Sequence, residues 1–312
     1  MGALSLTWRP LSHALPPGRV ATTAGRSLIA TGLALGSPPL KTARFERVEE
    51  PRVSGPTVRG EWVRTSRVTR SDGAVLYLHG SGYVVCSSRT HRGLTSQIAD
   101  RTGLPVFSID YRLAPSARFP AASDDARAAW DWLLAKGHDP ARVVVAGDSA
   151  GGHLALLLAL QLAREGEPLP AALVTLSPLV DTTLRGGTIR DRIERDPFAA
   201  AAVAQRALGG YFDHPAAHHA ARIDFTDVDC FPPTLVHNGS REMLAGDCTE
   251  LTRRLRAAGF EAKHRVWPGL MHVFQAMTAV FPESDAALSD IAEFITGRLP
   301  TTTGHRDLEA TA

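Results

Sequence analysis

Residues 143–152 read Val-Val-Val-Ala-Gly-Asp-Ser-Ala-Gly-Gly, and a second apolar run follows at residues 154–160. The β-branched first part predicts a buried strand, and the second run predicts a helix. Glycines stand two residues before and two residues after Ser149, as in the G-x-S-x-G pattern of a nucleophile elbow. Glycine suits both positions because side chains would clash in so sharp a turn. We therefore expect Ser149 at the tip of the turn, with its hydroxyl at the positive end of the helix.

The composition is that of an ordinary globular protein with room for one large α/β domain. The 312 residues are 44% hydrophobic and 21% charged, with a net charge of +2 and no basic run, so nucleic acid is not an expected partner. Three cysteines without paired spacing predict neither a disulfide framework nor a zinc motif. No N-terminal apolar stretch approaches the roughly 20 residues of a membrane span. Without a recognisable secretory signal, we expect a cytoplasmic protein that does not span a membrane.

Strand-like and helix-like segments alternate along the chain. The strand-like runs are residues 75–78, 106–109, 143–145, 173–176, 234–236 and 264–267. The helix-like segments between and after them are residues 91–102, 123–136, 152–165, 247–258 and 283–298. Continuous apolar runs are typical of a parallel sheet that is covered on both faces. The alternation therefore predicts an α/β fold with a mostly parallel central sheet flanked by helices.

One segment, residues 185–229, has no strand signal, although residues 198–208 look helical. An insertion here would lie over the carboxyl ends of the strands, where ligands bind in such sheets. We interpret it as a helical cap insertion; the alternative is a plain crossover helix with long loops. Residues 1–45 would form an N-terminal cap segment, and residues 46–298 the main domain. The polar tail, residues 299–312, is expected to be disordered.

A serine nucleophile needs a base, an acid that orients the base, and donors for an oxyanion. In α/β-hydrolases the acid and the histidine follow the serine in that order. Residues 269–274 lie between a predicted strand and a predicted helix, which makes His272 the candidate base. The other histidines that we considered are worse placed: His153 in the helix after Ser149, His214, His218 and His219 in the insertion, and His264 within a strand.

The candidate acid is Glu242, the first carboxylate after the strand at residues 234–236. Asp247 is the rival, five residues further on. It resembles a first-turn residue of the next helix, where a carboxylate interacts favourably with the helix dipole.

Candidate oxyanion donors come from two places. Residues 77–83, Tyr-Leu-His-Gly-Ser-Gly-Tyr, follow an early strand, and such a glycine-rich loop can turn backbone N–H groups towards one point. The N–H group of Ala150, next to the candidate nucleophile, adds a further donor.

Four blocks of the sequence resemble the hormone-sensitive-lipase-like family of α/β-hydrolase esterases, in the same order, over about residues 60–298. Residues 79–82 match its H-G-G-G box, with serine in place of the second glycine. Residues 110–126 match the following stretch, residues 147–152 match G-D-S-A-G-G, and His272 matches the histidine before the last helix. The resemblance implies an α/β-hydrolase fold with a helical cap, and hydrolysis of carboxylic esters without metal or cofactor.

The resemblance also implies roles for the loop at residues 79–82. The oxyanion N–H groups would be those of Ser81, Gly82 and Ala150, while His79 and Gly80 would be structural. Ser81 departs from the family pattern, and its side chain restricts the backbone and would narrow the acyl pocket.

A second departure concerns the acid. The family usually has aspartate followed by Pro-Leu, whereas this chain has Glu242 followed by Met-Leu, as some members do. The implied site is Ser149, Glu242 and His272, with an acyl-enzyme on Ser149.

The implied substrates are small esters with short acyl chains. A subset of the family that is similar over residues 82–92 suggests terpene-derived lactones as an alternative. Two other classes stay open: a non-catalytic ligand-binding protein on the same fold, and a peptidase, amidase or thioesterase. The sequence does not fix the oligomeric state, and a homodimer is one option.

Overall fold

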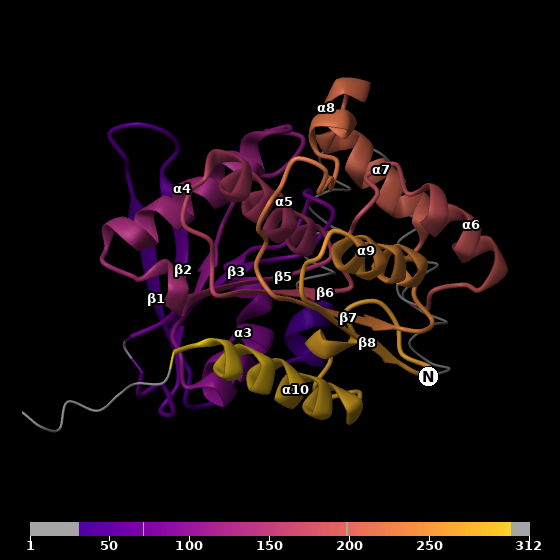
Figure 1. The fold of residues 1–312 in the computed structure, drawn as a ribbon. Coiled ribbons are helices and arrows are strands. Elements are labelled where there is room, and N and C mark those ends of the chain that lie inside the picture. The colour runs from indigo at the N-terminus through magenta and orange to yellow at the C-terminus, as the bar shows by residue number, and fades with distance from the viewer. Residues whose placement is uncertain (1–30, 71, 198, 301–312) are drawn as a thin grey trace, which may run out of the picture.

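The computed structural model describes residues 31–70, 72–197 and 199–300. Within these residues one eight-stranded sheet crosses the molecule in the order β1-β2-β4-β3-β5-β6-β7-β8 (Figure 1). The strands are β1 (Arg44–Glu50), β2 (Val58–Arg64), β3 (Ala74–Leu78), β4 (Val106–Ile109), β5 (Val143–Asp148), β6 (Ala172–Leu176), β7 (Thr234–Gly239) and β8 (Ala262–Trp267). Strands β3 to β8 pair in parallel, whereas β2 pairs antiparallel with both β1 and β4. The predicted α/β class with a mostly parallel sheet is confirmed.

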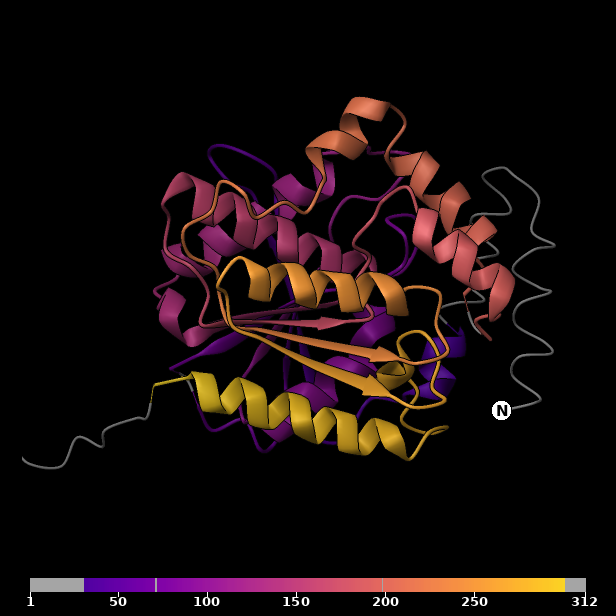
Figure 2. The ribbon, with the colours of Figure 1, turned by 45° about the vertical axis from the view of Figure 1, so that its right-hand side comes forward.

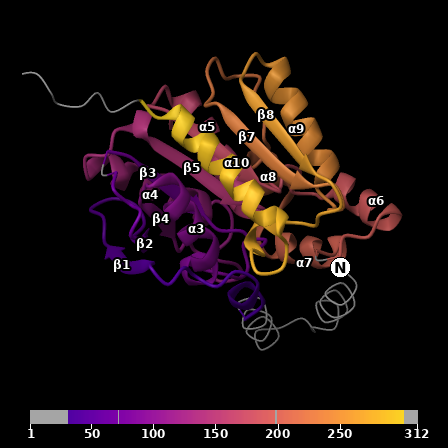
Figure 3. The ribbon, with the colours of Figure 1, turned by 90° about the horizontal axis from the view of Figure 1, so that it is seen from below.

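Helices cover both faces of the sheet. On one face lie α4 (Ala121–Ala135), α5 (Ala150–Glu165) and α9 (Ala245–Ala257), and on the other lie α3 (Arg92–Thr102) and α10 (Glu283–Arg298) (Figure 1). Seen from below, α10 runs across the sheet next to α3 (Figure 3). Short 3₁₀ helices occur at η1 (Ser88–His91), η2 (Pro140–Arg142) and η3 (Phe274–Ala276).

Two hydrophobic cores result, because successive side chains of a strand point to opposite faces. Leu76 and Val145 pack in the core that includes α4, α5 and α9. Their neighbours Val75 and Val144 pack in the core beneath, with α3 and α10. This burial on both faces is why the parallel strands have continuous apolar sequences.

Three helices lie between β6 and β7: α6 (Arg185–Ile193), α7 (Ala201–Tyr211) and α8 (Pro215–Ala220). Figure 2 shows α6 and α7 beyond the carboxyl ends of β7 and β8. No strand occurs within residues 185–197 and 199–229, as expected. No helix in the described part of the chain has both the length and the apolar character to cross a membrane.

Two strands were not predicted from the sequence. The charged strand β1 lies at the edge of the sheet, and most of its residues are exposed or half-buried. In β2 a buried Glu61 is neutralised by Arg92, with two N–O distances of 2.8 and 2.6 Å. Strand β1 also crosses the boundary expected between residues 45 and 46. Residues 1–30 of the expected N-terminal segment and residues 301–312 of the expected tail lie outside the described residues.

The turn from β5 into α5 has the predicted sharp geometry. Ser149 has φ 51° and ψ −117°, and α5 begins at the next residue. A Cβ atom on Gly147 would overlap the Gly151 carbonyl, and one on Gly151 would overlap the Leu78 carbonyl oxygen. The two glycines therefore allow β3, β5 and α5 to approach closely at this turn.

We expect Gly151→Ala to lower the melting temperature sharply, because the new methyl group overlaps backbone that cannot move independently. Gly297→Ala is the matched control: Gly297 is also helical, and an added Cβ would meet no atom within 4 Å. Helix propensity predicts that the free energy of unfolding of this control rises by up to about 1 kcal/mol. Equal melting temperatures for the two variants would contradict the close approach described here.

Candidate active site

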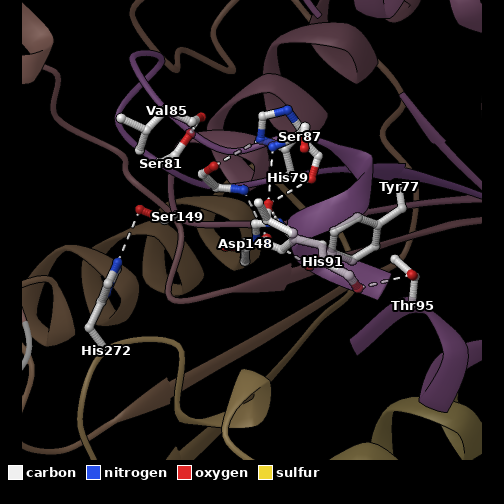
Figure 4. Close-up of polar contacts among 12 residues, drawn as sticks. Tyr77, His79, Ser81, Val85, Ser87, His91, Thr95, Asp148, Ser149 and His272 are labelled. Carbon is white, nitrogen blue, oxygen red and sulfur yellow. Dashed lines mark hydrogen bonds and ion pairs between the residues drawn. The ribbon is translucent and has the colours of Figure 1, made fainter. Parts of the chain in front are cut away.

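Ser149 and His272 meet at the carboxyl edge of the sheet. Ser149 lies at the tip of the β5–α5 turn, and His272 lies in the loop between β8 and η3. The distance from His272 Nε2 to Ser149 Oγ is 3.0 Å (Figure 4). Strands β5 to β8 are parallel neighbours, so the loops that follow them come together at this edge. A ring nitrogen at this distance can accept the hydroxyl proton.

Glu242 lies on the other side of the His272 ring. Its side chain is fully buried, and Oε2 accepts hydrogen bonds from Ser177 Oγ at 2.7 Å and from the Gly239 N–H group at 2.9 Å. Glu242 Oε1 is 3.7 Å from His272 Nδ1, beyond hydrogen-bond distance. Both atoms are buried and have no hydrogen-bond partner within the described residues. They therefore face each other at a distance that a small shift would turn into a hydrogen bond, and they form an ion pair when His272 is protonated.

Ser177 links the acid to the loop that carries the histidine, a role that the sequence analysis missed. It follows β6, and its hydroxyl donates to Glu242 while accepting from the Val273 N–H group at 3.1 Å. The available signal was a serine directly after the buried strand at residues 173–176.

Asp247, the rival acid, lies in the first turn of α9, as expected. It is beside α6, where a Cβ atom on Gly186 would lie 2.8 Å from its Oδ1. Burial and the negative charge of Asp181 raise the pKa of Asp247 to about 6. The structure thus brings Glu242 to His272 and places Asp247 against the insertion.

Three successive residues of the loop after β3 have positive φ angles. Ser81, Gly82 and Tyr83 have φ angles of 129°, 60° and 65°. Successive residues with unusual dihedrals can direct neighbouring N–H groups to one side, which forms a nest for negative charge. The Ser81 hydroxyl donates to the Val85 carbonyl oxygen in the same loop (Figure 4). Its hydroxyl is thus used within the loop.

Asp148 holds this loop from behind. Its Oδ1 accepts from the Tyr77 hydroxyl at 2.7 Å and from the Gly80 N–H group at 2.9 Å, and lies 3.4 Å from His91 Nε2 (Figure 4). Burial alone would raise the pKa of Asp148, but His91 and these hydrogen bonds hold it below its usual range. A side chain at Gly80 would overlap the Asp148 carboxylate. The sequence signal for this anchor was a charged residue at the end of a buried strand.

His79 is buried beside the same anchor. Its ring stacks on Tyr111 with centroids 4.2 Å apart, and the Tyr111 hydroxyl donates to the His79 carbonyl oxygen at 2.6 Å. Burial lowers the pKa of His79 to about 4, so the ring is neutral near pH 7. These contacts are those of a residue that supports the loop.

His153, which we considered for the base, lies one helical turn after Ser149 and points elsewhere. Its Nδ1 is 2.6 Å from the Tyr83 hydroxyl, and its Nε2 is 2.9 Å from the Ala221 carbonyl oxygen. A carbonyl can only accept, so Nε2 carries the proton and Nδ1 accepts from Tyr83. Tyr83 also stacks on Tyr211 of α7, with centroids 4.2 Å apart. His153 therefore connects the loop after β3 to the insertion.

Nearby carboxylates favour the protonated form of His272. Burial would lower the pKa of His272, but Glu242 above all, and also Asp196 and Asp148, raise it above the usual value. The surroundings therefore stabilise a positively charged imidazole. Among the described residues no group of three or more histidine, cysteine, aspartate or glutamate side chains is arranged to hold a metal ion.

We expect Glu242→Gln to lower kcat by about 10²–10⁴-fold, because the amide cannot stabilise a charged His272. It should also move the acid limb of the kcat/KM profile to lower pH. His272 must be neutral to accept a proton, and the mutation removes the main group that raises its pKa.

The matched comparison is Asp247→Asn, which neutralises the rival carboxylate and should leave kcat within about threefold of the parent. Ester hydrolysis measured from pH 4 to pH 9 checks both variants. A larger loss for Asp247→Asn than for Glu242→Gln would reverse the assignment.

Comparisons with known proteins identify the family of the chain. Residues 75–276 match the family model described as alpha/beta hydrolase fold. The chain is 36% identical over 258 residues to Esterase LipU of Mycobacterium tuberculosis, covering 78% of this chain and 85% of that protein. It is 37% identical over 241 residues to an acetyl-hydrolase of Streptomyces hygroscopicus, covering 75% of this chain and 78% of that protein.

A solved esterase from the bacterial hormone-sensitive lipase family has the same overall structure. It superposes with a TM-score of 0.83 at 36% identity and covers 93% of this chain and 95% of its own. The family model spans more than half of the chain, and these relatives match most of its length. The chain therefore belongs to the hormone-sensitive-lipase-like family of α/β-hydrolase esterases.

Proposed function

We propose that the protein hydrolyses small carboxylic esters with short acyl chains through an acyl-enzyme on Ser149. The observation that carries this proposal is the 3.0 Å contact between Ser149 Oγ and His272 Nε2 at the tip of the β5–α5 turn. Carboxylic ester hydrolysis is the activity class of the relatives named esterase. The relative named acetyl-hydrolase supports a short acyl group.

In the proposed first step, Ser149 Oγ attacks the ester carbonyl while His272 Nε2 accepts its proton. Glu242 faces the other ring nitrogen and stabilises the imidazolium that forms. His272 then gives the proton to the leaving alcohol, and the acyl group stays on Ser149. Water attacks this acyl-enzyme with His272 again acting as the base, which releases the acid and restores the hydroxyl.

The negative charge of the tetrahedral intermediate would be met by the N–H groups of Ser81, Gly82 and Ala150. The positive φ angles of the loop and its anchoring by Asp148 support this assignment. Loss of one such donor typically lowers kcat by about 10²–10³-fold. The mechanism needs no metal and no cofactor.

We also propose that residues 185–229 form a cap over this site. The helices α6, α7 and α8, which lie between β6 and β7, support this proposal. A net charge of +2 without basic runs supports the proposal that nucleic acid is not a partner. We also propose the cytoplasm as the location, as expected from the sequence. A homodimer is the oligomer to look for first.

A panel of p-nitrophenyl esters with acyl chains of increasing length, a terpene-derived lactone and an anilide tests the proposal. We expect fastest turnover for the acetyl and butyryl esters, and a fall of at least about 10⁴-fold in kcat for Ser149→Ala. Ser289→Ala is the control, since that serine is exposed on α10.

Preferred turnover of the lactone or the anilide would change the substrate class while keeping Ser149. Ser149→Ala as active as the parent would overturn the mechanism. No turnover of any substrate would favour a binding protein on the same fold.

A further inference from the structure

Residues of the insertion, residues 185–229, form hydrogen bonds with the loop that carries Glu242. We call residues 239–243 the acid loop. From α6, Arg190 donates to the carbonyl oxygens of Ser240 at 2.6 Å and of Glu242 at 2.9 Å. From the segment between α6 and α7, Asp196 Oδ2 accepts from the Met243 N–H group at 3.2 Å. The carbonyl of Glu242 and the N–H group of Met243 belong to one peptide unit, which is therefore held on both sides by the insertion.

Asp196 is itself firmly placed. Its side chain is fully buried, and Oδ1 accepts from the Ala199 N–H group at 3.1 Å. Its own N–H group donates to Asp191 Oδ1 at 3.2 Å, and Asp191 Oδ2 accepts from the Ala201 N–H group at 3.1 Å. The end of α6 and the start of α7 thus form one hydrogen-bonded unit around two buried carboxylates. Burying a carboxylate is costly unless hydrogen bonds compensate for the loss of hydration. The hydrogen bonds of Asp196 offset this cost and hold its side chain against the acid loop.

The hydrogen bonds from Arg190 and Asp196 act at the part of the candidate triad that is most sensitive to position. Glu242 Oε1 and His272 Nδ1 are 3.7 Å apart and lack other hydrogen-bond partners within the described residues. The far oxygen of the carboxylate is fixed by Ser177 and Gly239. On the side of the acid, the Glu242 peptide is a further point that sets this separation, and Arg190 and Asp196 hold it.

We propose that Arg190 and Asp196 are positioning residues that couple the insertion to the candidate triad by fixing the Glu242–Met243 peptide. Through them, the packing of α6 and α7 sets the distance between the Glu242 carboxylate and the His272 ring. Neither side chain contacts the reacting atoms. The proposal rests on the proposed roles of Ser149, Glu242 and His272.

Asp196 has a second effect, through its charge. The carboxylates whose charges act on His272 are Glu242 from the acid loop, Asp196 from the insertion and Asp148 from the end of β5, and all three raise the His272 pKa. Removing the Asp196 charge therefore lowers the His272 pKa, so His272 stays neutral to a lower pH. The acid limb of kcat/KM should follow it downward.

The first test is Asp196→Asn, which keeps the side-chain shape and one acceptor oxygen, removes the charge, and replaces the other acceptor oxygen with an NH2 group. We expect the acid limb to move to lower pH, with kcat reduced and KM little changed. A role confined to folding would lower activity by the same factor at every pH, and that result would overturn the electrostatic part of the proposal.

The second test uses Arg190→Gln, which should lower kcat by about tenfold because the carbonyl oxygens of Ser240 and Glu242 each lose a donor. Arg192→Gln on the same helix is the control, since Arg192 is exposed, and it should leave kcat unchanged. If Arg190 acts through Glu242, its effect should largely disappear in the Glu242→Gln background. A loss of the same size in both backgrounds, or no loss in either, would overturn the coupling.

These outcomes can be told apart from failure of the proposed function. The parent protein and Ser149→Ala establish, on their own, whether ester hydrolysis depends on the serine. Melting temperatures identify any variant that fails to fold. If Asp196→Asn does not fold, the Arg190→Gln and Glu242→Gln cycle still decides the coupling.

Discussion

The close contact between the loop after β3 and the β5–α5 turn is the constraint on which the site depends. Three positions, Gly80, Gly147 and Gly151, lie so near neighbouring backbone or the Asp148 carboxylate that a side chain would overlap them. This closeness fixes the strained Ser149 backbone beside the loop that provides the proposed oxyanion donors. Strain of this kind persists only where the surrounding structure determines it. The sheet supplies that support, because strands β3 and β5 are buried on both faces.

Buried carboxylates compensated by backbone N–H groups recur around His272. Asp148 accepts from Gly80, Glu242 from Gly239, and Asp196 from Met243 and Ala199. Each hydrogen bond offsets part of the cost of burying a charge. Each also ties a loop of the site to an acid, so the same contacts fix geometry and stabilise a charged histidine. The same hydrogen bonds therefore determine both the electrostatics and the geometry of the site.

Much of this could be predicted from the sequence because the signals are local. The buried parallel strands have continuous apolar runs. The elbow pattern, the chain order and the predicted strand ends select Ser149, Glu242 and His272, with Asp247 as the rival acid, and the structure brings the first three together. Strands β1 and β2 were missed because their sequences are charged, and the burial of Glu61 depends on its distant partner Arg92. Arg190 and Asp196 were missed because their partners come from other parts of the chain. Ser177 was missed although a serine directly after a buried strand was a local signal, because its contacts with Glu242 and Val273 join distant segments.

The most direct test of the account is rapid quenching of the protein with p-nitrophenyl acetate, followed by peptide mapping by mass spectrometry. The account predicts an acetyl group on the peptide that contains Ser149, formed in step with the release of p-nitrophenol and absent from Ser149→Ala. An acetyl group on another residue, formed at the rate of turnover and retained in Ser149→Ala, would contradict it.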